Sequence, residues 1–132
     1  MTGRRNVSSA SAFEDVVGYS RAVRVGEHVW VSGTTAAVPD GGQPVGGDDA
    51  YVQAAEALRR VVAALAEVGA TPADVVRTRM FVTDIDRWPE VARAHVEVFG
   101  SVRPAATMVE VSRLIAPGLL VEVEADAWVG GR

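Results

Sequence analysis

Two stretches near the end of the chain alternate apolar and polar residues with the period of a β-strand. In residues 120–128 (LVEVEADAW), Val121, Val123 and two alanines share one face, and the acids between them share the opposite face. Residues 105–111 alternate with the same period, and the segment 115–118 (IAPG) between the two runs favours a turn. We therefore predict two adjacent antiparallel strands, whose acidic face meets either water or a polar site.

The composition is typical of one globular domain with a core of its own. The chain has 132 residues, of which 48% are hydrophobic and 23% are charged. No run approaches the ~20 apolar residues of a membrane-spanning helix, so we expect no membrane partner. Because there is no cysteine and the two histidines, His28 and His95, are far apart, we expect no metal site. The net charge of -4 argues against nucleic acid as a partner.

The start of the chain, MTGRRNVSSASA, is rich in serine and arginine and has no hydrophobic segment of the kind found in secretory signals. We therefore predict a flexible N-terminal tail over residues 1–16 and a single domain over residues 17–132. The expected location is the cytoplasm.

The middle of the chain alternates between strand and helix patterns. Residues 21–33 predict a hairpin that turns at Gly26-Glu27. Residues 51–68 and 87–99 have helical spacing of apolar residues, and residues 75–83 are β-branched and alternating. With the two final strands, the order is β-β-α-β-α-β-β. This order is typical of an α+β sheet with two helices packed on one face.

The other face of such a sheet has no helices and needs cover. Four large apolar side chains are expected there among charged residues: Phe81, Met108, Leu120 and Trp128. Apolar residues on an open face are typical of a subunit interface, so we expect an oligomer.

Five segments carry motifs in a characteristic order. They are Gly18-Tyr19-Ser20-Arg21-Ala22-Val23, Val31-Ser32-Gly33, residues 75–84, Arg103-Pro104-Ala105 and residues 109–125. Together they resemble the Rid family, also called the YjgF-like or reactive-intermediate-deaminase family. The resemblance implies a chorismate-mutase-like fold and a homotrimer with clefts between neighbouring subunits. It also implies hydrolysis of imines and enamines to a 2-keto acid and ammonia, with no metal or other cofactor.

The resemblance also implies roles for individual residues. Tyr19 matches the family's cleft tyrosine, Gly33 the glycine whose backbone meets the ligand, and Glu122 the glutamate that orients the hydrolytic water. Ala106 stands where the deaminase pattern has the arginine that clamps the substrate carboxylate. Such a contact is worth about 1.5–3 kcal/mol, so its loss lowers activity on 2-aminoacrylate roughly ten- to hundredfold or more. Met108 stands where many members have a small residue or cysteine, which predicts a more apolar cleft floor.

Three further residues are candidates for the site. Arg79 could replace the missing guanidinium, or it could pair with a glutamate of the last two strands, which we favour. Arg103 could reach a ligand, although an arginine just before a proline at a strand entry is usually solvated. His95 could transfer protons near neutral pH, or it could pack on the buried face of its helix.

Two functions remain open. The first is an enzyme that hydrolyses or tautomerises a small imine, enamine or enol, with Glu122 positioning water and Tyr19 aligning the ligand. The second is a trimeric metabolite-binding protein without chemistry, because loss of the anion clamp fits both functions. We favour the enzyme. RNA cleavage, a role assigned to some relatives, has little support in an acidic chain without a basic stripe.

Overall fold

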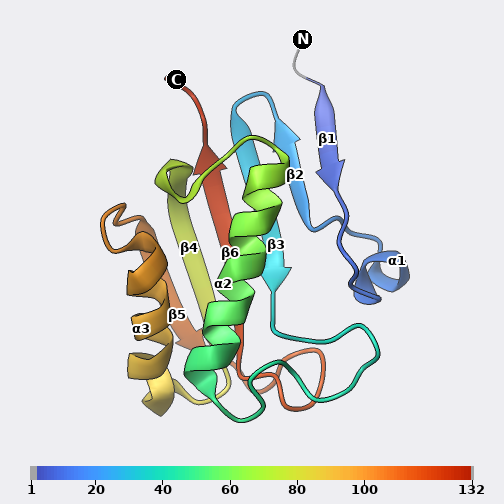
Figure 1. Ribbon diagram of the computed structural model, residues 1–132, viewed down its shortest axis with the longest axis vertical. Coiled ribbons are helices and arrows are strands. Elements are labelled where there is room, and N and C mark those ends of the chain that lie inside the picture. The colour runs from blue at the N-terminus through green and yellow to red at the C-terminus, as the bar shows by residue number, and fades with distance from the viewer. Residues whose placement is uncertain (1–2, 132) are drawn as a thin grey trace.

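The alternating segments form one six-stranded sheet in the computed structural model, which describes residues 3–131 (Figure 1). The strands are β1 (Arg4–Val7), β2 (Ala22–Val25), β3 (His28–Thr34), β4 (Val75–Val82), β5 (Ala105–Glu110) and β6 (Val121–Trp128). They lie in the order β1-β2-β3-β6-β4-β5. The helices are α1 (Phe13–Val17), α2 (Ala50–Glu67) and α3 (Trp88–Phe99), with short 3₁₀ turns at Pro72–Asp74 and Ile85–Arg87.

From β2 to β6, the elements follow the predicted order β-β-α-β-α-β-β, and α2 and α3 lie on the same face of the sheet (Figure 1). β2 and β3 form the predicted hairpin, where Gly26 takes a φ of 58° in the turn. Asp49 precedes α2, and its side chain accepts a hydrogen bond from the backbone N–H of Val52. The prediction of an α+β fold is therefore confirmed.

The pairing of the last two strands differs from the prediction. β6 lies between β3 and β4 and is antiparallel to both, whereas β5 pairs in parallel with β4 at the edge of the sheet. α3 supplies the crossover that a parallel pair requires, and residues 111–120 then carry the chain past β4. The two strands run antiparallel to each other, as predicted, but the prediction that they are neighbours was wrong, because alternation identifies the two faces of a strand but not its partners.

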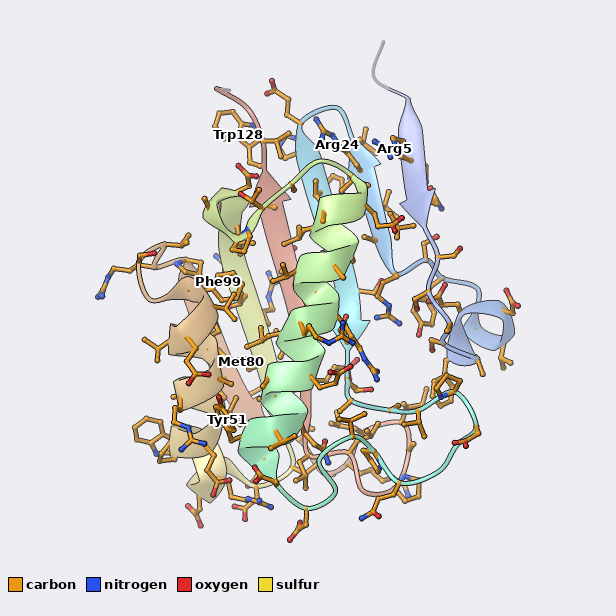
Figure 2. All side chains as sticks on the ribbon, in the orientation of Figure 1. Arg5, Arg24, Tyr51, Met80, Phe99 and Trp128 are labelled. Atoms are coloured by element: carbon orange, nitrogen blue, oxygen red, sulfur yellow. The ribbon has the colours of Figure 1, made fainter. Side chains whose placement is uncertain are left out.

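The beginning of the chain is also part of the fold, so the predicted flexible tail over residues 1–16 was wrong for the described residues. β1 pairs with β2, and α1 follows it. Arg5 and Arg24 donate hydrogen bonds of 2.9 and 2.5 Å to the carbonyl oxygens of Glu67 and Val68 (Figure 2). These oxygens end α2, where the helix dipole favours cations. The strand ladder and the arginines thus hold this segment in place.

The core lies between the sheet and its two helices. Met80 of β4 and Phe99 of α3 are both buried in this layer (Figure 2). On β6, the buried side chains are every second residue: Val121, Val123, Ala125 and Ala127. The acids of β6 therefore face away from the helices, as the alternation predicts. No helix among residues 3–131 is long and apolar enough to cross a membrane.

The face without helices carries two exposed tryptophans. Trp30 of β3 and Trp128 of β6 alternate with buried neighbours and are 47% and 45% exposed. Met108 and Leu120 were predicted for the same face but pack against the core instead. Met108 is in register with the buried Met80, on the helix side of the sheet. Leu120 precedes β6 and lies outside its alternation.

Candidate functional site

A cavity of about 1390 Å³ lies at the end of the sheet where β3 stops and β6 begins. Three segments that are distant in the sequence enclose it: residues 7–17, residues 35–44 and residues 115–119. In Figure 1 the two long loops lie below the sheet, and α1 lies above the right end of the loop that follows β3. Glu122 and Glu124 of β6 reach the cavity from the sheet.

The Glu122 carboxylate lies against the backbone of β3 at Gly33. A β-carbon at Gly33 would lie 2.0 Å from Oε2 of Glu122, so any other residue there would displace the carboxylate. The register between β3 and β6 shifts between Val31 and Thr34, which marks an irregularity in β3 at this point. The glycine and the irregularity together make room for one acidic group.

The Glu122 carboxyl is half-buried, and this burial raises its pKa above the usual value for glutamate. The negative charge of Glu124 raises the pKa further, whereas the Arg21 guanidinium lowers it. A carboxyl with a raised pKa both accepts and returns protons more readily near neutral pH than an exposed one.

Arg21 lies at the centre of a hydrogen-bond network beside this carboxyl, and it was not among the residues selected from the sequence. Its Nη1 donates to the carbonyl oxygen of Gly33 at 2.6 Å and to Oγ1 of Thr34 at 3.0 Å. Its Nη2 donates to the Tyr19 hydroxyl at 3.1 Å. The sequence offered one signal for Arg21: it lies two residues after Tyr19, just before a strand, within the motif of residues 18–23.

Arg21 also ties the N-terminal segment to the cavity. Its Nε lies 3.8 Å from the carboxylate of Glu14, and both side chains are buried. Glu14 in turn accepts hydrogen bonds from the backbone N–H and the hydroxyl of Ser9. α1 is thus anchored by a buried ion pair.

Gln53 of α2 joins two loops beside the cavity, a role that no sequence motif indicated. Its side chain is fully buried. Nε2 donates to the carbonyl oxygens of Gly47 and Gly118 at 2.7 and 2.8 Å, and Oε1 accepts from the N–H of Leu120 at 2.9 Å. One amide therefore fixes the loop before α2 and the loop before β6.

The structure brings together three of the five residues first selected from the sequence. Tyr19, Gly33 and Glu122 all line the cavity. Ala106 and Met108 lie on the edge strand β5, and neither belongs to the cavity wall formed by the described residues. Within one chain, Met108 is therefore not the floor of this site.

Neither candidate arginine lines the cavity of the described chain. Nη1 of Arg79 lies 3.2 Å from Oε1 of Glu124 and 3.5 Å from Oδ2 of Asp126, so the favoured ion pair forms. Arg103 is exposed and takes a φ of 58°, and its backbone N–H donates to the carbonyl oxygen of Phe99. Arg79 is thus occupied by two acids of β6.

His95 packs on the helix side of the sheet. Its Nε2 lies 2.8 Å from Oγ1 of Thr78, and its ring lies 4.9 Å from the Phe99 ring. Burial lowers the pKa of His95 below the usual value for histidine. Thr78 is in register with Ala106 on β5. His95 and Ala106, which were both selected from the sequence, therefore lie on the same side of the sheet.

The chain matches the family model described as Endoribonuclease L-PSP over residues 9–129. A crystal structure of a YjgF/YER057c/UK114 family member from Mycobacterium tuberculosis is 57% identical, with a TM-score of 0.87. That match covers 96% of this chain and 100% of the other. The chain belongs to the YjgF/Rid family. The resemblance inferred from the motifs is therefore confirmed.

Two further proteins match this chain over similar lengths. An uncharacterized protein of Streptomyces coelicolor is 40% identical over 126 residues, which cover 96% of this chain and 92% of that protein. The human 2-iminobutanoate/2-iminopropanoate deaminase is 32% identical over 127 residues, which cover 96% and 91% of the two chains.

Proposed function

We propose that this YjgF/Rid protein hydrolyses a small reactive imine or enamine, with Glu122 as the catalytic group that positions and deprotonates water. The observation that carries the proposal is the Glu122 carboxylate, which is half-buried in a large cavity and seated on Gly33. Its raised pKa suits proton transfer near neutral pH. The name of the human relative, a 2-iminobutanoate/2-iminopropanoate deaminase, supports the same reaction class.

The neighbouring residues fit supporting roles in this reaction. Tyr19 lines the cavity, and its hydroxyl accepts a hydrogen bond from Arg21. In this position Tyr19 aligns the ligand. The Glu122 carboxylate removes a proton from water as the water attacks the imine carbon, and the protonated carboxyl then returns the proton to nitrogen. An enamine first takes a proton at carbon from the protonated carboxyl and becomes an iminium ion, which leaves Glu122 ionised and able to deprotonate the attacking water.

The proposal includes a homotrimer in which a neighbouring copy closes each cavity. Trp30 and Trp128 support it, because they are about half exposed on the face of the sheet that has no helices. Ala106 and Met108 lie on the helix side of the sheet, opposite to the face that carries Glu122, and neither lines the cavity of its own chain. In the proposed trimer they would meet a cavity of another copy. The molar mass in solution, measured by light scattering, tests this part of the proposal, and a monomer contradicts it.

The test of the reaction is ammonia release from imines that an oxidase generates in the assay. We expect the wild type to accelerate release and Glu122→Gln to lose about 10²-fold or more of this acceleration. Asp126→Asn is the matched control, because Asp126 shares the strand and its face but does not line the cavity. Equal rates for wild type and Glu122→Gln contradict the proposal. Saturable thermal stabilisation by a metabolite without turnover would favour the binding protein.

A further inference from the structure

Arg21 joins two of the three sequence-selected residues that line the cavity. Its Nη1 donates to the carbonyl oxygen of Gly33 at 2.6 Å, and its Nη2 donates to the Tyr19 hydroxyl at 3.1 Å. The side chain is buried, and the buried carboxylate of Glu14 lies 3.8 Å from its Nε. Arg21 is therefore a buried cation in a fixed position, from which it contacts both residues at once.

The contact with Arg21 decides which kind of hydrogen bond the Tyr19 hydroxyl can make with a ligand. A guanidinium carries only donors, so the Tyr19 oxygen accepts and its own proton points to another partner. None of residues 3–131 accepts this proton within hydrogen-bond distance, and Tyr19 lines the cavity. The hydroxyl is thus left as a donor toward the cavity, where it selects an acceptor atom.

Arg21 also holds the backbone on which the Glu122 carboxylate sits. The register of β3 against β6 shifts between Val31 and Thr34, and such irregularities leave backbone groups outside the regular ladder. Arg21 supplies a donor to the Gly33 carbonyl oxygen and, at 3.0 Å, a second one to Oγ1 of Thr34. A β-carbon at Gly33 would overlap the Glu122 carboxylate, so this stretch of backbone directly contacts the proposed reacting group.

These contacts of Arg21 all lie within one chain. In the proposed homotrimer a neighbouring copy adds groups to the cavity, but it does not supply the acceptors of Arg21 or its ion pair with Glu14. A group of the neighbouring copy that meets the Tyr19 hydroxyl also meets a donor. The direction of the Tyr19 hydrogen bond and the support of Gly33 therefore belong to the single chain.

The charge of Arg21 acts on Glu122 through space as well. Burial and the negative charge of Glu124 raise the pKa of the Glu122 carboxyl, and the Arg21 guanidinium lowers it. The nearby Arg79 is occupied by Glu124 at 3.2 Å. At a given pH, Arg21 therefore keeps a larger share of Glu122 in the carboxylate form, which is the form that takes a proton from water.

We propose that Arg21 is the positioning residue of this site: it presents the Tyr19 hydroxyl as a hydrogen-bond donor to the ligand, and it fixes the Gly33 backbone and a positive charge beside the Glu122 carboxylate. This inference rests on the proposed imine hydrolysis and adds a residue to it. Glu122 takes the proton from water, Tyr19 donates a hydrogen bond to an acceptor atom of the ligand, and Arg21 acts through both.

The first test separates the position of the guanidinium from its charge. Arg21→Lys keeps a cation, but one ammonium group cannot make the three hydrogen bonds of the planar guanidinium in the same places. Its kcat/KM for imine hydrolysis should fall at least about tenfold, the usual worth of a charge-assisted hydrogen bond. The pH inflection of kcat/KM that depends on Glu122 should stay at the wild-type position.

Arg24→Lys is the matched control for this variant. Arg24 donates to the backbone oxygens of Gly26 and Val68, and it does not line the cavity of the described chain. It should retain the wild-type kcat/KM. Equal rates in Arg21→Lys and Arg24→Lys overturn the inference.

The second test removes the charge. Arg21→Gln alone leaves Glu14 buried without its cation, so the double variant Arg21→Gln/Glu14→Gln is compared with Glu14→Gln. In the double variant the pH inflection should move to higher pH, because the cation that lowers the pKa of Glu122 is gone. Glu14→Gln retains this cation and should not show the rise. An inflection at the same pH in both variants overturns the inference.

A double-mutant cycle tests whether Arg21 acts through the Tyr19 hydroxyl. Tyr19→Phe removes the hydroxyl, so Arg21→Lys has less left to disturb in that background. We expect the loss in kcat/KM caused by Arg21→Lys to be at least about threefold smaller in Tyr19→Phe than in the wild type. The same loss in both backgrounds means that Arg21 contacts the ligand by itself, and this overturns the positioning role.

Carbon-13 NMR signals test the inference without any substrate. The Cζ signal of Tyr19, assigned with Tyr19→Phe, should shift in Arg21→Lys but not in Arg24→Lys, because only the first variant takes the guanidinium from the hydroxyl. The carboxyl signal of Glu122, assigned with Glu122→Gln, should titrate at higher pH in Arg21→Gln/Glu14→Gln than in Glu14→Gln. If the wild type does not accelerate ammonia release, imine hydrolysis falls, and these two signals still decide the role of Arg21. Failure of either expected change overturns that role.

Discussion

The Glu122 carboxylate occupies the space that a side chain at Gly33 would need: a β-carbon there would lie 2.0 Å from Oε2 of Glu122. Gly33→Ala should therefore push the carboxylate away from its present position. A displacement of about 1 Å at a reacting group can cost roughly 10²-fold in rate, so we expect a loss of about that size in imine hydrolysis. Because the end of a flexible side chain yields, the melting temperature should change little. Unchanged activity in Gly33→Ala would contradict the proposed position of the reacting group.

Arg21 and Glu14 form a buried ion pair, which predicts a strong effect on stability. Arg21→Gln leaves the Glu14 carboxylate buried without its cation, and breaking such a pair costs about 3–5 kcal/mol. Urea denaturation should show this loss in the free energy of unfolding. In the double variant Arg21→Gln/Glu14→Gln, most of the loss should be recovered. A loss in the double variant equal to the sum of the losses in the two single variants would show that the pair is not coupled.

Gln53 makes three hydrogen bonds to backbone groups of two loops. Gln53→Leu leaves these groups without a partner at a buried site, so we expect a loss of about 2–4 kcal/mol in the free energy of unfolding. Gln43→Leu is the matched control, because Gln43 is exposed and its replacement should change stability by about 0.5 kcal/mol or less. Similar losses in both variants would contradict the role of Gln53.

The half-buried His95 should make the stability of the fold depend on pH. Burial lowers its pKa in the folded state, so the unfolded chain binds a proton first as the pH falls. The free energy of unfolding should therefore decrease below about pH 6.5, the ordinary value for histidine. His95→Gln should remove this part of the pH dependence, whereas the exposed His28→Gln should retain it. Identical pH profiles for wild type and His95→Gln would refute the assignment.

Local periodicity was enough to predict most of the elements. The alternation in β6, the Gly26 turn and the helical spacing of α2 and α3 all act over a few residues, so the sequence displays them directly. Strand pairing is not local. β6 inserts between β3 and β4 because of contacts between distant segments, and alternation says nothing about such neighbours. The same limit applies to Met108, whose strand was identified but whose face was not.

The site could be predicted in part. Motifs selected Tyr19, Gly33 and Glu122, which line one cavity. The residues that hold them were missed: Arg21 spans three acceptors from different positions on the chain, and Gln53 reaches a loop 65 residues away. Supporting hydrogen bonds of this kind depend on the folded geometry. They leave no periodic trace in the sequence.

The most direct test of the account is the pH dependence of kcat/KM for imine hydrolysis. Burial and Glu124 raise the pKa of the Glu122 carboxyl above its ordinary value of 4.5. We predict that the ratio of wild-type to Glu122→Gln rates rises with pH through an inflection above 4.5, as the carboxylate forms. A ratio near one at every pH, with both proteins folded, would contradict the role of Glu122 as the group that activates water.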